Sequence, residues 1–292
     1  MWIVPRRLAV NQSEAADTML LTSGGLIYDK SITDLIISSL MEEHREFYAG
    51  LSGIELPVPK YQFPSEFQKT SRLTYYATFF NSIEVNSSFY KIPMKATVIR
   101  WASSVPGNFR FTFKLFREVT HIKDLAFEAS YVARFLEIIS HVGEKRGCLL
   151  VQFPPSLQSE SIRQLEKLLS AISEGDPDRT WPVAVEFRNR AWYIPEVYDL
   201  LEFHKASLVI HDIQRSATPL NIVFSDEIYV RFHGPTGNYR GSYTEAFLQE
   251  YAEYIQDWLK ERKNVYVYFN NTAGDAFNNL RTLKRLINDS GH

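Results

Sequence analysis

Short apolar runs alternate with longer amphipathic stretches along most of the chain. The short runs lie at residues 46–53, 82–86, 109–114, 148–153, 182–188, 207–212, 227–234 and 264–271. Apolar runs of this length are typical of buried parallel strands. The stretches between them have helical spacing of apolar residues and predict helices at 65–80, 93–105, 124–142, 159–173, 194–205, 244–261 and 274–288. Residues 213–226 are the exception, because they are few and lack a helical period.

This order of elements predicts an α/β protein. Eight strand–helix units in about 240 residues match a TIM (β/α)8 barrel in number and size. A doubly wound open sheet is the competing fold, but it usually carries a glycine-rich phosphate turn after its first strand. Residues 50–57, GLSGIELP, do not contain that G-x-G-x-x-G fingerprint. We therefore expect one TIM-barrel domain over residues 47–292, with a shortened or missing helix after the sixth strand.

The first 46 residues do not fit this pattern and predict an N-terminal extension. Residues 1–30 have no convincing period, so deleting them is expected to leave the fold nearly as stable. Residues 31–44, SITDLIISSLMEEH, place their isoleucines and leucines on one face and predict a short amphipathic helix. The extension over residues 1–46 is therefore expected to be partly helical.

The composition indicates a soluble globular protein and limits the classes of function. The net charge of −2 gives no overall attraction to nucleic acid or to a membrane, so a basic site must be local. Cys148 is the single cysteine of the chain, which excludes an internal disulfide and a cysteine-rich zinc site. No apolar stretch approaches the roughly 20 residues that span a bilayer, and no signal peptide is apparent. These features predict a cytoplasmic protein with no membrane partner.

Polar side chains follow almost every predicted strand at its carboxyl end, where a TIM barrel has its active site. They are Ser52, Glu84, Asn86, Lys114, Gln152, Glu186, Arg188, His211, Asp212, Arg231, His233, Asn270 and Asn271. Gathering so many ionisable groups at one mouth costs desolvation free energy that only pairing offsets. The pattern therefore predicts a functional site at this end of the strands.

Six segments of the chain resemble, in order, the YecE-like family, also called domain of unknown function seventy-two. They are YYATFFNSIEVNSSFYKIP, FRFTFKLFREVTH, LLVQFPPSL, VAVEFRNRAWY, YVRFHG and VYVYFNNTAGDAFNN. The resemblance runs from about Phe47 to Ile287 and implies a TIM barrel without an assigned reaction. It places family motif positions on Glu84, Asn86, Phe89, Tyr90, Lys114, His121, Gln152, Glu186, Arg188, Trp192, Asp212, Arg231, His233, Gly234, Asn270 and Asn271. The family's usual opening motif, Gly-Thr-Ser-Gly followed by a tryptophan and a tyrosine, is here GLSGIELP with neither aromatic.

The chemistry of these residues suits an anion, most readily a phosphate. Residues 233–243 and 270–277 form glycine-containing loops after the seventh and eighth strands, the usual phosphate site of TIM barrels. Asp275 lies near the start of the last helix and competes with an anion there. Aromatic residues that border the same mouth suit stacking on a nucleotide, on single-stranded nucleic acid or on a sugar. They are Phe89, Tyr90, Trp192, Tyr193, Tyr239 and Tyr243.

We expect an enzyme, a hydrolase or lyase, that acts on a nucleotide, a nucleic acid or a sugar phosphate. The expected catalytic residues are Glu186, His233, Glu84 and Asp212. The expected substrate-binding residues are Asn86, Tyr90, Lys114, Gln152, Arg188, Trp192, Arg231, Gly234, Asn270 and Asn271. A non-catalytic module that binds nucleic acid with the same mouth stays open as the alternative, because a TIM barrel does not fix one activity.

Cofactors and the role of Arg231 are left open by the sequence. The side chains of Glu186, His211, Asp212 and His233 are of the types that bind a divalent metal ion, although barrels that cleave abasic sites with metals carry more such ligands. Arg231 is expected to hold the anionic ligand, and its alternative role is that of a structural partner of Glu186. An acid–base pair of glycosidase type is disfavoured, because nearby arginine and lysine keep the glutamates ionised.

Overall fold

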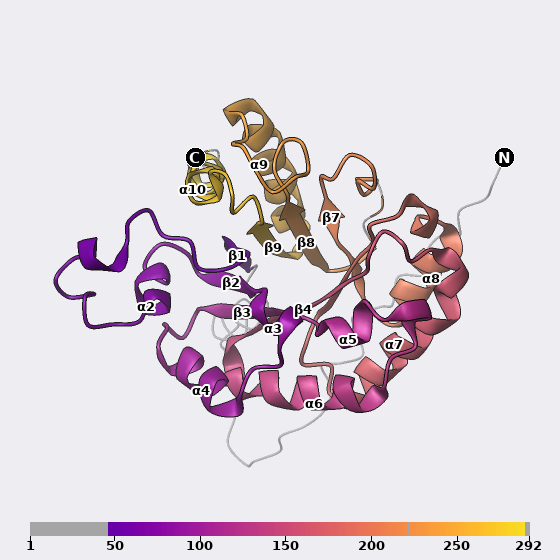
Figure 1. Ribbon diagram of the computed structural model, residues 1–292. Helices are drawn as coiled ribbons and strands as arrows, with labels where there is room; N and C mark the ends of the chain where they lie inside the picture. Colours follow the sequence, from indigo (N-terminus) through magenta and orange to yellow (C-terminus); the bar gives the residue numbers. More distant parts are fainter. Residues whose placement is uncertain (1–45, 221, 223, 290–292) are drawn as a thin grey trace, which may run out of the picture. The chain divides into compact units, whose positions relative to one another are not determined.

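The computed structural model describes residues 46–220, 222 and 224–289 (Figure 1). The predicted N-terminal extension and its helix lie outside the described residues. Within the described ranges, no helix has both the length and the apolar character needed to cross a membrane.

The described strands form two parallel sheets, which confirms the predicted α/β class. One sheet has the order β1 (Phe47–Leu51), β9 (Asn264–Phe269), β8 (Glu227–Phe232) and β7 (Ile210–His211). The other has the order β2 (Ser82–Val85), β3 (Arg110–Lys114), β4 (Arg146–Gln152), β5 (Val183–Glu186) and β6 (Ser207–Leu208). Each of the eight predicted runs contains a strand, and the run at 207–212 contains both β6 and β7.

The two sheets adjoin at Val209, the residue between β6 and β7. The Val209 N–H donates to the carbonyl of Val185 on β5 at 2.9 Å, while β7 pairs with β8. The segment 207–211 therefore contacts a strand of each sheet.

The sheets also adjoin at β1 and β2, where side chains replace strand-to-strand hydrogen bonds. The Asn81 amide accepts from Ala49 N at 3.0 Å and donates to Phe47 O at 2.8 Å. The Tyr76 hydroxyl accepts from the backbone of β1 and donates to the Ser82 carbonyl of β2 at 2.9 Å. A Cβ added at Gly50 would lie 2.1 Å from the Ser82 carbonyl oxygen, so the close approach of the strands requires glycine. A closed eight-stranded barrel remains a prediction at this point.

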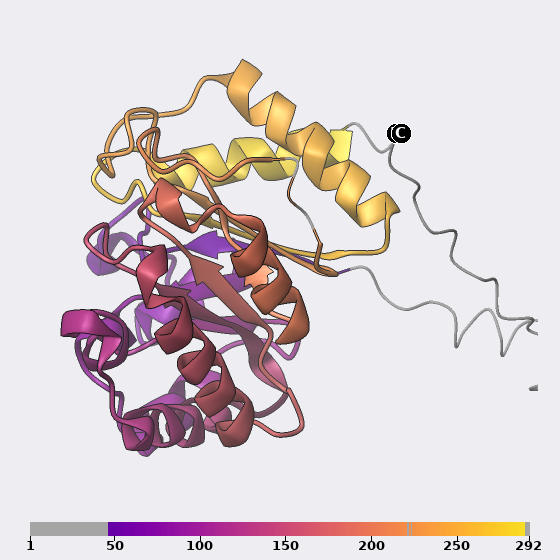
Figure 2. The same cartoon turned by 90° about the vertical axis from the view of Figure 1, so that its right-hand side faces the viewer.

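Helices cover the outer side of both sheets (Figures 1 and 2). The α-helices are α2 (Arg72–Tyr76), α3 (Ser87–Tyr90), α4 (Lys95–Ser103), α5 (Arg117–Thr120), α6 (Ala129–Ile139), α7 (Ile162–Gly175), α8 (Pro195–Phe203), α9 (Glu245–Lys260) and α10 (Ala276–Asp289). The 3₁₀ turns are η1 (Lys60–Gln62), η2 (Lys123–Leu125), η3 (Ser140–Lys145), η4 (Ser159–Ser161) and η5 (Arg190–Trp192). Between β7 and β8 the described residues contain no helix, as the sequence predicts.

Two predicted helices begin more than a full turn later than their sequence pattern suggests. The helix predicted at 65–80 starts at Arg72, where the Ser71 hydroxyl accepts from the Thr74 N–H at 3.0 Å. The helix predicted from residue 124 starts at Ala129, because Asp124 and Leu125 have φ angles of 53° and 51°. These left-handed angles are incompatible with an α-helix.

A second group of buried side chains lies on the inner side of the strands, away from the helices. It consists of Tyr48, Cys148, Leu150, Ala184, Val209, Tyr229, Tyr266 and Tyr268. The Tyr268 hydroxyl on β9 bonds the Ser82 hydroxyl on β2 at 2.6 Å and the Thr112 hydroxyl on β3 at 2.7 Å. The inner faces of the two sheets therefore contact each other, beneath a polar layer at the carboxyl ends of the strands.

Candidate functional site

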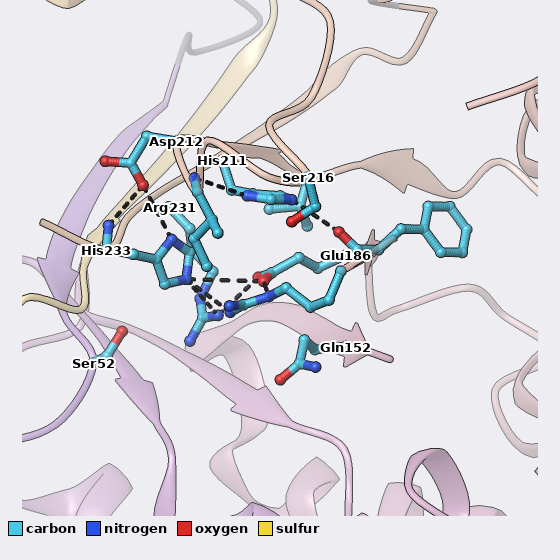
Figure 3. A network of polar contacts seen from close by, with 12 residues as sticks. Ser52, Gln152, Glu186, His211, Asp212, Ser216, Arg231 and His233 are labelled. Carbon is cyan, nitrogen blue, oxygen red and sulfur yellow. Dashed lines mark hydrogen bonds and ion pairs between the residues drawn. The ribbon is translucent and has the colours of Figure 1, made fainter. Parts of the chain in front are cut away.

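A buried network of ion pairs connects the carboxyl ends of β2, β5 and β8. Arg231 of β8 donates from Nε and Nη2 to the two carboxylate oxygens of Glu84 on β2, at 2.8 and 2.6 Å. Its Nη1 donates to Oε2 of Glu186 on β5 at 2.7 Å, and Oε1 of Glu186 accepts from Nε of Arg188. Figure 3 shows Arg231 and Glu186 within this network. One arginine thus holds two carboxylates that come from the same sheet, opposite its own.

Both glutamates of the network are fully buried but stay ionised. Burial alone would raise the pKa of Glu84, but Arg231 and hydrogen bonds from Ser52 and Tyr229, each at 2.6 Å, hold it below its usual range. Burial would likewise raise the pKa of Glu186, but the charges of Arg188 and Arg231 hold this pKa well below its usual range. The network therefore has two anions and two cations and no net charge of its own.

His233 is neutral and fully buried next to the two arginines. Its Nε2 lies 2.9 Å from Nη2 of Arg188 and 3.2 Å from Nη1 of Arg231, and because guanidinium groups only donate, Nε2 accepts. The hydrogen-bond pattern assigns the proton to Nδ1, which lies 3.2 Å from Oδ1 of Asp212. Burial, and then the charge of Arg188, lowers the pKa of His233 well below its usual range.

Asp212 fixes the loop that follows β8. Its Oδ1 accepts from the backbone N–H of His233 at 2.8 Å, and its Oδ2 accepts from the Tyr243 hydroxyl. That hydroxyl in turn accepts from the Gly234 N–H at 2.5 Å. Gly234 has a φ of 93°, and a Cβ there would lie 2.2 Å from the Arg240 carbonyl oxygen. Burial raises the pKa of Asp212 to about 6.

His211 stabilises the backbone around the site rather than facing its mouth. Its Nε2 donates to the Phe187 carbonyl at 2.9 Å, and its Nδ1 accepts from the Ile213 N–H at 3.3 Å. These contacts define a neutral imidazole. Burial, which outweighs the nearby Glu186, lowers the pKa of His211 to about 4.

Lys114 lies at the carboxyl end of β3 and differs from the arginines of the network. Its Nζ lies 4.1 Å from the ring centroid of Phe89, and no carboxylate of the described residues lies within 4.0 Å of it. Burial, and then the charge of Arg231, lowers the pKa of Lys114 to about 8, against the opposing charges of Glu186 and Glu84. His121 packs edge-on against the same Phe89 ring at 4.8 Å, and burial and Lys114 lower its pKa to about 4. Lys114 therefore provides a cation that the protein itself does not neutralise by direct pairing.

Arg188 is the network member that also contacts a surface side chain. Its Nη1 donates to the hydroxyl of Tyr239 at 3.2 Å, and Tyr239 is 41% exposed. The Gln152 amide, which donates to the Phe153 carbonyl at 2.5 Å, lies close to this network in Figure 3. Asn270 is buried, and its backbone N–H donates to the Phe232 carbonyl at 2.7 Å.

Besides Asn86, whose amide donates to the Ser52 carbonyl at 3.3 Å, three residues expected to bind substrate lie outside the network. Trp192 is fully buried, its indole N–H donates to the Leu157 carbonyl at 2.9 Å, and its ring stacks on Phe187 at 4.7 Å. Asn271 is also buried, and its amide donates to the Gly241 carbonyl and to Asn279, both at 3.0 Å. Both side chains therefore stabilise packing in this structure, whereas the third, Tyr90, is 69% exposed.

The contacts of Arg231 agree with its alternative role as a structural partner of Glu186. It is 1% exposed, and its three nitrogens already donate to Glu84 and Glu186. Sequence reasoning also missed the hydroxyls of Tyr229 and Tyr243, which complete the network. The alternation of Tyr229, Arg231 and His233 along β8 was an available signal for the first of these.

The described residues contain no group of three or more histidine, cysteine, aspartate or glutamate side chains arranged to hold a metal ion. The nitrogens and oxygens of Glu186, His211 and His233 are instead hydrogen-bonded to arginines and backbone groups.

Comparisons with known proteins agree with the resemblance seen in the sequence. Residues 49–292 match the family described as "Protein of unknown function DUF72". The UPF0759 protein YunF of Bacillus subtilis is 26% identical over 261 residues, covering 77% of this chain and 89% of that protein. The UPF0759 protein YecE of Escherichia coli K12 is 28% identical over 97 residues, covering 33% of this chain and 36% of that protein.

Solved structures are also similar to this chain. The crystal structure of a DUF72 family protein from Thermotoga maritima has a TM-score of 0.68 at 25% identity, covering 83% of this chain and 99% of that one. A DUF72 family protein from Enterococcus faecalis has a TM-score of 0.67 at 26% identity, covering 84% and 98%.

Proposed function

The chain belongs to the DUF72 family of proteins of unknown function, and we propose from the site geometry that it is an enzyme acting on a phosphate-containing substrate. The observation that carries the proposal is Lys114, a partly buried cation without a carboxylate partner among the described residues. Arg188 lies in the same network of charges and contacts the exposed Tyr239. Lysine and arginine together are the usual protein ligands of phosphate.

The proposal includes a TIM (β/α)8 barrel as the scaffold of the site. Three features support it: the segment 207–211 contacts both sheets, side chains of Tyr76 and Asn81 bridge β1 and β2, and the inner faces share the hydrogen bonds of Tyr268. The strand ends that carry Glu84, Glu186 and Arg231 then surround one mouth, as in other TIM barrels.

Proton transfer in this enzyme is assigned to Lys114 rather than to Glu186 or His233. Glu84, Glu186 and His233 are fully buried, so they position the arginines instead of touching a substrate. An amine whose pKa is about 8 is close to the ideal for a general acid or base near neutral pH. Lys114 would hold the substrate phosphate and give a proton to its leaving oxygen, as a hydrolase or a lyase requires. Arg188, whose nitrogens already donate to Glu186, Tyr239 and His233, adds positive charge nearby.

Two exposed tyrosines favour a nucleotide or a nucleic acid as the substrate class. Tyr239 bonds Arg188, and Tyr90 packs edge-on at 5.0 Å against Phe89, the ring that holds Lys114. Each cation therefore has an exposed aromatic ring close by, and such rings stack on nucleobases. The same features support the alternative of a non-catalytic nucleic-acid-binding module.

The proposal is tested with the purified full-length protein, inorganic phosphate, nucleoside monophosphates and short single-stranded oligonucleotides. Binding is measured by calorimetry, and turnover by release of phosphate or of cleaved product. Lys114→Met should reduce phosphate affinity about tenfold or more, the range of a charged hydrogen bond. Lys95→Met, on the exposed first turn of α4, is the matched control and should bind like the wild type.

Lys114→Arg separates an enzyme from a binding module. Arginine keeps the positive charge but does not release its proton near neutral pH. An enzyme should therefore retain most of its ligand affinity and lose turnover in this variant. If no anion binds, or if Lys114→Met binds phosphate as well as the wild type does, the proposed function is wrong. Binding without turnover in the wild type would instead identify the non-catalytic module.

A further inference from the structure

A separate cavity of about 260 Å³ lies on the outer side of the sheet, between β2–β3 and helices α2 and α4. Figure 1 shows α2 and α4 beside these strands. The cavity is lined by Gly53, Ile54, Leu73, Ile83, Val85, Asn86, Ser87, Trp101 and Phe111. Most of these side chains are apolar, and none of the charged residues of the ion-pair network lines the cavity. The cavity is therefore distinct from the candidate functional site.

One buried polar atom of this lining has no hydrogen-bond partner among the described residues. Oδ1 of Asn86 is buried and unpaired among the described residues, whereas Nδ2 of the same amide donates to the Ser52 carbonyl at 3.3 Å. A buried acceptor without a donor costs free energy in the folded protein. A donor supplied by a bound ligand would remove this cost.

We propose that this cavity binds a small, flat, mainly apolar molecule with a single hydrogen-bond donor, of the indole or phenol type. An apolar cavity of about 150 Å³ is known to accept benzene, so the larger volume here accommodates a two-ring molecule. The rings of Trp101 and Phe111 offer aromatic contacts, and Asn86 Oδ1 accepts the donor. Asn86 comes directly after β2, the strand that carries Glu84. An occupant of the cavity would therefore contact a strand that also contributes to the ion-pair network.

Ile54 is a partly buried residue of the cavity lining. This residue comes directly after Gly53, which has a φ of 124°, and the two residues form part of the lining. A larger side chain at position 54 would occupy the volume that the branched isoleucine leaves free. Ile54→Trp is therefore the variant that removes the cavity while changing no charge.

Binding is tested with indole and with indene, which has the same shape but lacks the N–H donor. Saturable binding of indole to the full-length protein is followed by ligand-detected NMR. Indole should bind about fivefold more tightly than indene, the effect of one hydrogen bond to a neutral acceptor. Ile54→Trp should abolish binding of both compounds, and Asn86→Leu should make the two affinities equal.

Two controls keep the outcome clear. Ile99→Trp adds the same side chain to the exposed face of α4, outside the lining, and should bind indole like the wild type. Lys114→Met should also leave indole affinity unchanged, so that failure of the proposed phosphate site and failure of this cavity are distinguished. Thermal melting confirms that each variant is folded. The proposal is overturned if wild-type protein does not bind indole up to its solubility limit, or if folded Ile54→Trp still binds it.

Discussion

Arg231 and Glu84 form a two-point ion pair between strands of different sheets. Nη2 of Arg231 lies 2.6 Å from Oε1 of Glu84, and Nε lies 2.8 Å from Oε2. Both side chains are fully buried, and 147 positions of sequence separate them. This parallel pair of charged hydrogen bonds fixes β8 relative to β2 and leaves Arg231 little capacity for a ligand.

Removing Arg231 should destabilise the protein strongly. Arg231→Met leaves the carboxylates of Glu84 and Glu186 buried without their main partner, which typically costs about 3–5 kcal/mol. The free energy of unfolding in urea measures this loss. Arg285→Met is the matched control, because Arg285 pairs with Glu245 at the same 2.6 Å on the surface, and its loss should be far smaller. Equal losses in the free energy of unfolding would show that the buried ion pairs of Arg231 stabilise the protein no more than the surface pair does.

Anion affinity should depend on pH through Lys114. The amine is charged below its pKa of about 8, so phosphate affinity should fall as the pH rises from 7 to 9. The stability of the ligand-free protein should change with pH in the opposite direction. Between pH 8 and 10.5 the unfolded chain binds more protons at this lysine, so the stability increases with pH. Calorimetry of wild type and Lys114→Met across this range tests both statements, and a variant with the same pH profile as the wild type would refute them.

His211 should contribute to unfolding in acid. Its pKa is about 4 in the folded protein, against 6.5 in the unfolded chain, because it is buried. The unfolded state therefore binds more protons as the pH falls from 6.5 to 4, and up to about 3 kcal/mol of stability is lost. In His211→Gln this contribution is missing, so the stability difference from the wild type should shrink as the pH falls. A difference that stays constant across this range would contradict the assignment of a neutral, buried imidazole.

The Tyr243 hydroxyl should matter for stability through the Gly234 N–H, from which it accepts, and the Asp212 carboxylate, to which it donates. Tyr243→Phe keeps the ring, which stacks on Phe247 at 4.8 Å, but leaves the buried Gly234 N–H without its acceptor and Oδ2 of Asp212 without this donor. The expected loss is about 1–3 kcal/mol in the free energy of unfolding. Tyr254→Phe removes an exposed hydroxyl that bonds Glu250 on the same helix and should have little effect. If the two variants unfold alike, the hydroxyl of Tyr243 is not needed to hold the loop after β8.

The sequence by itself determined the order of strands and helices and the set of side chains at the strand ends. Both follow from local rules: a parallel strand buried on both faces is a short apolar run, and an amphipathic helix repeats its apolar residues every three to four positions, roughly. For the same reason Glu84, Lys114, Glu186 and Arg231 could be assigned to one end of the strands before any contact between them was known. Helix starts were less accurate, because the positive φ angles of Asp124 and Leu125 leave no clear signal in the sequence.

Only the tertiary structure decided which of these charges are paired and which remain available. In the sequence, Arg231 and Lys114 are equally candidate cations at strand ends. In the structure, Arg231 contacts two glutamates, whereas Lys114 lies on the ring of Phe89. The difference arises because pairing depends on distances of a few ångströms between residues more than a hundred positions apart, and desolvation depends on everything packed around them. The packing role of Trp192 and the cavity beside Asn86 have the same origin, since neither burial nor empty volume is a property of one segment.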